Sequence, residues 1–138
     1  FPRVVTDKQK GEIHVLILHD GFNRKANKKL THKRQLILSK RSLIINDFIG
    51  GNGSVTVNNF FNFGQDLKLI NSQNNSFFFS NGMTFLKGIN SKNVKHQRCE
   101  NFGWSHPSYG IKLPIERIQL KTTVTLPGVI KNKIFLND

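Results

Sequence analysis

The stretch "SVTVNNFFNF", residues 54 to 63, alternates between two kinds of side chain over most of its length. One face carries most of the apolar side chains and one asparagine: Val55, Val57, Asn59, Phe61 and Phe63. The other face carries Ser54, Thr56, Asn58, Phe60 and Asn62. A period of two residues is typical of a β-strand with one buried face. This stretch therefore predicts a strand that lies on a core, which the rest of the chain must complete.

Similar short apolar runs, separated by Gly, Asn, Asp and Ser, occur along the rest of the chain. The Gly and Asn residues of "GGNG" (50–53) and "SNG" (80–82) supply the positive φ angles that tight turns between strands need. No segment has convincing helical spacing, because even "DKQKGEIHVL" (7–16) is interrupted by Gly11. Besides residues 54–63, we expect strands at 12–18, 32–38, 42–49, 66–70, 76–80, 83–89, 115–126 and 133–136.

Many short strands joined by turns indicate an all-β fold. We predict an antiparallel β-sandwich of two stacked sheets, supersandwich-like, formed by residues 1–138 as a single domain, since 138 residues suffice for one core. The expected core comprises Val15, Ile17, Leu36, Leu38, Ile44, Val55, Val57, Phe61, Leu67, Leu69, Phe78, Phe85, Ile118 and Leu120.

The chain is strongly basic, with a formal net charge of +13 and a pI near 10.3. Such a surface attracts polyanions over roughly a Debye length, about 8 Å at physiological salt. Nucleic acid, anionic lipid and acidic polysaccharide are all compatible partners. A general bias of composition towards Lys and Asn would produce the same charge without any ligand, so both explanations stay open.

Part of this charge is concentrated in "HDGFNRKANKKLTHKRQLIL", residues 19 to 38, which joins two predicted strands. Six basic side chains form the candidate polyanion-binding site: Arg24, Lys25, Lys28, Lys29, Lys33 and Arg34. The alternative is that they form a solvated hairpin edge, because charged edges discourage strand pairing between molecules.

No pattern of residues indicates catalysis or a metal. The eight acidic residues are scattered over separate predicted elements, and the five histidines show no HxH or HExxH spacing. The single cysteine, Cys99, has no CxxC partner. We therefore predict no catalytic residue, no metal site and no cofactor in this chain. We also predict no membrane span, because no apolar run approaches ~20 residues.

The segment "ENFGWSHPSYGIKLP", residues 100 to 114, contains the only Trp and the only Tyr of the chain. His106 and Tyr109 lie close enough in sequence to suggest an acid and base pair. Spacing within a loop fixes no mutual geometry, however. We favour a loop that crosses the sheet and is pinned by burial of the Trp104 and Tyr109 rings.

Two segments together resemble a known family. "HDGFNRKANKKLTHKRQLILSKRSLIINDFIGGNGSVTVNNFFNF" (19–63) resembles the C-terminal β-sandwich region of heparinase II/III-like proteins. There a His-Asp-Gly-aromatic turn precedes a His-basic-Arg strand, a strand that ends in an acidic residue, a glycine turn and an alternating strand. "GWSHPSYGIKLP" (103–114), followed by "LPGVI" (126–130), resembles the closing part of that region.

The resemblance implies a polysaccharide lyase, in which an α/α toroid packs on a β-sandwich and uronic-acid-containing chains are cleaved by β-elimination. The family's catalytic Tyr, His and Asn and its metal ligands lie in segments that nothing here matches, and His106 and Tyr109 match variable positions. We therefore expect this chain alone to be inactive and to serve a structural or substrate-holding role.

The resemblance also implies partners and a location. An acidic polysaccharide and an upstream α/α toroid catalytic domain are the expected partners, and a periplasmic or secreted location is favoured. Because the chain begins "FPRVVTDKQK" rather than with Met, we expect it to be a processed product or a piece of a longer protein. A basic β-module that binds nucleic acid or another polyanion without catalysis is the alternative function.

Overall fold

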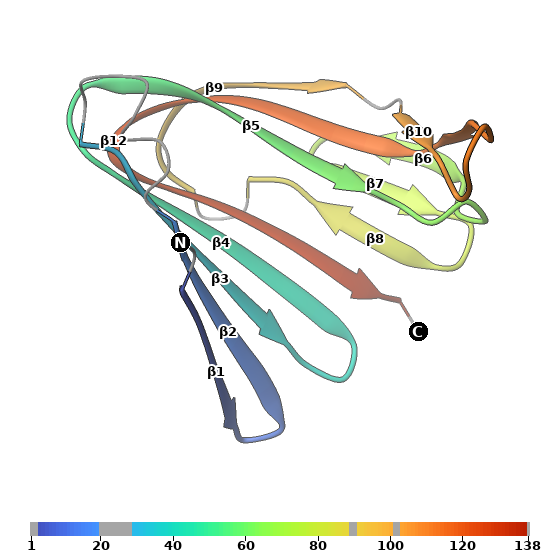
Figure 1. Ribbon diagram of the computed structural model, residues 1–138, viewed down its shortest axis with the longest axis horizontal. Helices are drawn as coiled ribbons and strands as arrows, with labels where there is room; N and C mark the ends of the chain where they lie inside the picture. Colours follow the sequence, from blue (N-terminus) through green and yellow to red (C-terminus); the bar gives the residue numbers. More distant parts are fainter. Residues whose placement is uncertain (1–2, 20–28, 89–90, 101–102, 138) are drawn as a thin grey trace.

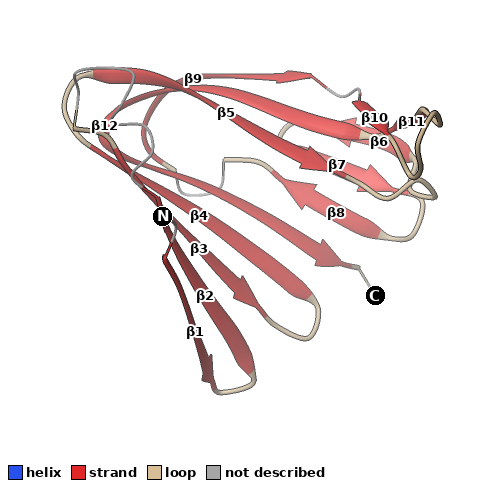
Figure 2. Ribbon diagram, viewed as in Figure 1, coloured by secondary structure: helices blue, strands red, loops and turns tan. Residues whose placement is uncertain are grey.

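The computed structural model describes residues 3–19, 29–88, 91–100 and 103–137, of which 94–100 are described by their backbone alone. Strands dominate these residues, and none of them lies in a helix (Figure 2). The strands are β1 (Arg3–Gln9), β2 (Glu12–His19), β3 (Thr31–Leu38), β4 (Ser42–Gly50), β5 (Ser54–Asn62), β6 (Leu69–Gln73), β7 (Ser76–Phe79), β8 (Met83–Leu86), β9 (Lys92–Glu100), β10 (Gly103–Ser105), β11 (Leu113–Ile115) and β12 (Arg117–Leu136).

The strand β12 is 20 residues long and belongs to both layers of the fold (Figure 1). Its first part, residues 117–125, pairs with β5 on one side and β9 on the other. Its second part, residues 128–136, pairs with β4 and β8 and completes the series β1-β2-β3-β4-β12-β8-β7-β6. The two layers are therefore hydrogen-bonded into one antiparallel sheet, whereas β10 and β11 form a separate pair.

The change of layer occurs at residues 126–128 of β12. The amide of Leu126 donates a hydrogen bond of 2.8 Å to the carbonyl of Gly53, which ties the bend to the turn between β4 and β5. A Cβ on Gly128 would lie 2.1 Å from Cγ1 of Val124. Glycine at this position therefore allows the strand to fold back closely over its own earlier residues.

A phenylalanine cluster fills the space between the layers. Phe85 is fully buried, and its ring centroid lies 4.9 Å from that of Phe61 and 6.0 Å from that of Phe77. Phe63 and Phe79 pack beside it with their centroids 4.4 Å apart. A second cluster around the bend of β12 comprises Ile49, Val124, Leu126 and Ile130. Both clusters join residues of β12 to residues of other strands.

The predicted all-β antiparallel sandwich is confirmed, and so is the two-faced pattern of residues 54–63, in which Phe60 is exposed and Asn59 is buried. The expected strands at 115–126 and 133–136 are parts of one strand, β12. The strand predicted at 66–70 begins only at Leu69. Four strands were not expected from the sequence: β1, β9, β10 and β11.

Six residues of the expected core are not buried in it. Four of these are half-buried and belong to neither apolar cluster: Val15, Ile17, Leu36 and Ile44. Leu38 is 46% exposed and ends β3 at the end of the β1–β4 layer that lies away from β5 and β9 (Figure 1). Phe78 is only half-buried, whereas Phe77 and Phe79 face the cluster; alternation along β7 places the middle residue of the three on the other face. Among the described residues, no helix is long and apolar enough to cross a membrane.

Candidate functional site

The described part of the basic stretch does not form a single patch. The layer formed by β1–β4 has two faces. We call the face that carries Asp47 the inner face, because it is turned towards β5. The opposite face is called the outer face. Alternation along β3 places Arg34 on the inner face and Lys33 on the outer face. Lys29 is exposed just before β3. Arg24, Lys25 and Lys28 lie outside the described residues, so their role stays a prediction.

On the inner face, Asp47 is the centre of a cluster of charged and polar side chains. Its carboxylate is fully buried and accepts a hydrogen bond of 2.7 Å from Arg34 Nε and one of 2.9 Å from Nη2. His32 Nε2 lies 2.7 Å from Oδ1, and Asn59 Nδ2 donates to Oδ2 at 3.1 Å. Because Asn59 belongs to β5 and the other residues to β3 and β4, the cluster connects the two layers.

The environment of Asp47 keeps it ionised. Burial raises the pKa of this carboxyl group, but the hydrogen bonds and positive charge of His32 and Arg34 lower it by more, and the resulting pKa lies below its ordinary value. An ionised carboxylate only accepts hydrogen bonds, so Nε2 of His32 carries the hydrogen of that contact. The positive charge of Arg34 is therefore paired with the carboxylate of Asp47.

A smaller cavity of about 360 Å³ opens beside this cluster, between β3, β4 and β5. Its lining combines apolar side chains such as Val55 and Val57 with His32 and Arg34. Arg34 keeps 32% of its side chain exposed there. The cluster thus borders a space between the layers, but its cations already contact a carboxylate.

A larger cavity of about 840 Å³ lies on the outer face, at the end of the sheet where β2 ends and β3 begins. Strands β1, β2, β3, β4, β9 and β12 all contribute to its lining. Lys33 extends over the Phe48 ring with its ammonium nitrogen 4.6 Å from the centroid. Arg3 and Lys92 also line this cavity, and sequence reasoning missed both because they lie far from residues 19–38 in the chain.

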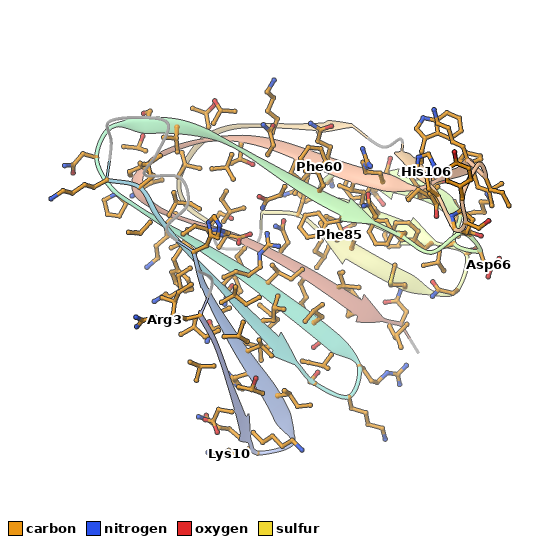
Figure 3. All side chains as sticks on the ribbon, viewed as in Figure 1. Arg3, Lys10, Phe60, Asp66, Phe85 and His106 are labelled. Carbon is orange, nitrogen blue, oxygen red and sulfur yellow. The ribbon has the colours of Figure 1, made fainter. Side chains whose placement is uncertain are left out.

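The segment at residues 103–115, which begins with β10 and ends with β11, is more exposed than expected. Tyr109 is fully exposed rather than pinned, and Trp104 is 41% exposed with Lys112 Nζ 4.2 Å from its ring centroid. His106 is exposed at the same end of the molecule (Figure 3). Within the described chain no hydrogen bond joins His106 to Tyr109, so nothing in the geometry favours an acid and base pair.

The described residues hold no group of three or more His, Cys, Asp or Glu side chains that could bind a metal. His96 and Cys99 lie in β9, where only the backbone is described. The expected absence of a metal site and of a cofactor therefore remains a prediction.

The fold is that of an antiparallel β-domain, and it is found in solved lyase structures. The chain matches heparan sulfate lyase HepC from Pedobacter heparinus with a TM-score of 0.71 and 9% identity, over 97% of this chain and 21% of that chain. It matches the heparinase III BT4657 gene product with a TM-score of 0.65 and 13% identity, over 96% of this chain and 21% of that one. A further heparinase III matches with a TM-score of 0.65 and 15% identity, over 98% and 21%.

At these identities the likeness shows the fold, and the resemblance drawn from residues 19–63, 103–114 and 126–130 is confirmed to that extent. The chain spans about a fifth of the length of these lyases. No family model matches the sequence, and no curated protein is similar to it.

Proposed function

We propose that this chain is the β-domain of a heparinase II/III-like polysaccharide lyase that acts on uronic-acid-containing acidic polysaccharide by β-elimination. The observation that carries the proposal is the likeness of nearly the whole chain to segments of heparan sulfate lyases and heparinases. His32, Arg34 and Asp47 lie in the segment that resembles this family, and their contacts with one another give these residues a structural role in the domain.

In a β-elimination the proton next to the uronate carboxyl group is removed and the glycosidic oxygen on the neighbouring carbon leaves. Negative charge develops on the carboxylate, and cations close to it lower the barrier. The net charge of +13 gives this chain the sign needed to hold such a polymer. In this proposal the proton transfers belong to an upstream α/α toroid domain, and this chain holds substrate and supports that domain.

The proposal is tested by the ultraviolet absorbance of the unsaturated uronate product. The isolated chain, given heparan-type and alginate-type substrates, is expected to give a flat trace. A longer protein in which this chain is joined to an α/α toroid domain is expected to turn over one of these substrates. Robust turnover by the isolated chain would contradict the assigned division of roles, and a longer protein inactive on every uronate polymer would contradict the lyase assignment.

A competition experiment separates this reading from a nucleic-acid-binding module. Salt dependence does not discriminate, because release of counterions accompanies binding to either polymer. Single-stranded DNA is therefore titrated against a bound sulfated polysaccharide, and the reverse. The two titrations give the concentration of DNA that displaces the polysaccharide and the concentration of polysaccharide that displaces DNA. A far lower value for DNA would replace the carbohydrate reading with the nucleic-acid one.

A further inference from the structure

The register of the sheet aligns residues from six strands in one line across the outer face. Directly paired in succession are Arg3, Leu18, Lys33, Phe48, Val129 and Lys92. We call these residues the cationic row. Directly paired residues of antiparallel strands project to the same face, so Arg3 and Lys33 share one line with Leu18, Phe48 and Val129. The pair of Val129 and Lys92 follows a register shift between β12 and β9, and Lys92 joins the row because it lines the same cavity.

All members of the cationic row line the 840 Å³ cavity. Leu18, Phe48 and Val129 form an apolar floor between the cations. Arg3 and Lys92 are exposed, and Arg3 points away from the ribbon near the start of β1 (Figure 3). None of the described lining residues is acidic. The nearest acid along β1 is Asp7, four residues from Arg3 and therefore about 13 Å away along the strand.

The spacing of the row suits an extended polymer better than a single small anion. Neighbouring strands lie about 4.8 Å apart, so Arg3 and Lys33 are separated by roughly 10 Å, and Lys33 and Lys92 by roughly 14 Å. One small anion does not reach all three cations. A chain with an anionic group at regular intervals does, if it runs across the strands.

The floor favours a polysaccharide over a nucleic acid. Stacking of bases needs exposed aromatic faces, and the only aromatic ring of the row, Phe48, is half-buried under the ammonium group of Lys33. The C–H faces of sugar rings pack on apolar side chains without a requirement for stacked aromatic rings, and Leu18 and Val129 supply such a surface. We propose that an acidic polysaccharide lies across the strands in this groove, with its carboxylate or sulfate groups on Arg3, Lys33 and Lys92, an assignment that rests on the proposed function.

The test compares two triple variants that remove the same charge. The row variant is Arg3→Gln, Lys33→Gln and Lys92→Gln, and the control variant is Lys8→Gln, Lys40→Gln and Lys68→Gln, three exposed positions outside the cavity lining. Binding of heparin oligosaccharides and of polyuronate oligosaccharides is measured by calorimetry at fixed salt. The row variant is expected to lose about tenfold in affinity, because three ion pairs of modest strength are removed, two of them at exposed cations. The control is expected to lose no more than about threefold through the reduced general field.

Oligosaccharide length gives a second readout. From Arg3 to Lys92 the row covers five strand spacings, about 24 Å. Affinity of the wild type is expected to rise with length until an oligosaccharide spans this distance and then to level off. The double variant Arg3→Gln and Lys92→Gln, which leaves the Lys33 and Phe48 contact intact, is expected to level off at a shorter length. This double variant also serves if the triple variant loses its circular dichroism signal.

The outcomes separate the two proposals. The wild type alone reports on the proposed function: if it binds neither class of oligosaccharide, the substrate-holding role is overturned, and the cationic row with it. If the wild type binds but the row and control variants lose equal affinity, the row is overturned while the proposed function stands. Tighter binding of single-stranded DNA with the same dependence on the row would overturn the polysaccharide as its occupant.

Discussion

Arg34 and Asp47 face each other directly across β3 and β4, and the guanidinium group binds the carboxylate through two hydrogen bonds of 2.7 and 2.9 Å. Since Asp47 is fully buried, loss of this partner leaves its charge in the interior with only the contacts to His32 and Asn59. The pair of Arg34 and Asp47 therefore has a structural role in the fold, whether or not a ligand binds.

Replacement of this arginine tests that conclusion. Arg34→Met is expected to lower the free energy of unfolding by about 3 kcal/mol, near the low end for a broken buried pair because the arginine remains partly exposed. The measurement is a urea titration followed by circular dichroism. Lys40→Met, on the exposed turn between β3 and β4, is the control and is expected to change stability by less than about 0.5 kcal/mol. Equal losses in the two variants would show that the pair contributes nothing special.

A fall in pH is expected to remove the stability that the ionised Asp47 contributes. The pKa of Asp47 is lowered in the folded state, whereas an unfolded aspartate titrates near pH 3.9, about its ordinary value. The stability that this group contributes is therefore fully present above about pH 4 and is lost as pH falls through the lower, folded pKa. Wild type and Asp47→Asn are compared by urea unfolding between neutral and acidic pH. The two stability curves are expected to converge at low pH, and parallel curves would contradict the assignment.

Part of this cluster could be found from the sequence. The predicted strands 32–38 and 42–49 are joined by a short turn, and a hairpin pairs each residue before the turn with one equally far behind it. The observed pair of Leu38 and Leu43 next to the turn places Arg34 opposite Asp47. An arginine paired with an aspartate near the end of an apolar strand is thus a local signal for a buried ion pair.

The cationic row carries no such local signal. Lys92 reaches the row only because β9 pairs with β12, and β12 in turn with β4, a contact between segments far apart in sequence. Strand β1 was missed because "RVVTDKQ" is mostly polar. In the structure its turn has φ angles of 45° at Lys10 and 80° at Gly11, as a type I′ hairpin requires, but only Gly11 carries a sequence signal for that turn.

Phe85 of β8, which is buried, and Phe60 of β5, which is exposed, allow a matched test of the core. Phe85→Ala is expected to cost about 3–5 kcal/mol, because its ring lies within the phenylalanine cluster and its removal leaves a cavity. Phe60→Ala makes the same chemical change on a side chain that is 52% exposed, and it should cost well under half as much. Figure 3 labels both rings. Thermal and urea unfolding of the two variants measure the difference, and similar losses would contradict the assigned layers.

The bend of β12 gives the last prediction. A Cβ at Gly128 would lie 2.1 Å from Val124 Cγ1 and 3.1 Å from the carbonyl oxygen of Thr125, and Val124 is itself fully buried. Gly128→Ala therefore forces either the core side chain or the backbone of the bend to move, and overpacking of this kind costs about 1–3 kcal/mol.

Gly64→Ala is the matched control, since a Cβ there would have no atom within 4 Å. That substitution is expected to leave stability unchanged or raise it slightly, because alanine restricts the unfolded chain. Because β12 joins the two layers at residues 126–128, Gly128→Ala should also speed hydrogen exchange of the amides of β4 and of the second part of β12 more than those of β1. A variant as stable as the control would mean that the bend tolerates a side chain and that the layers meet less closely than the structure indicates.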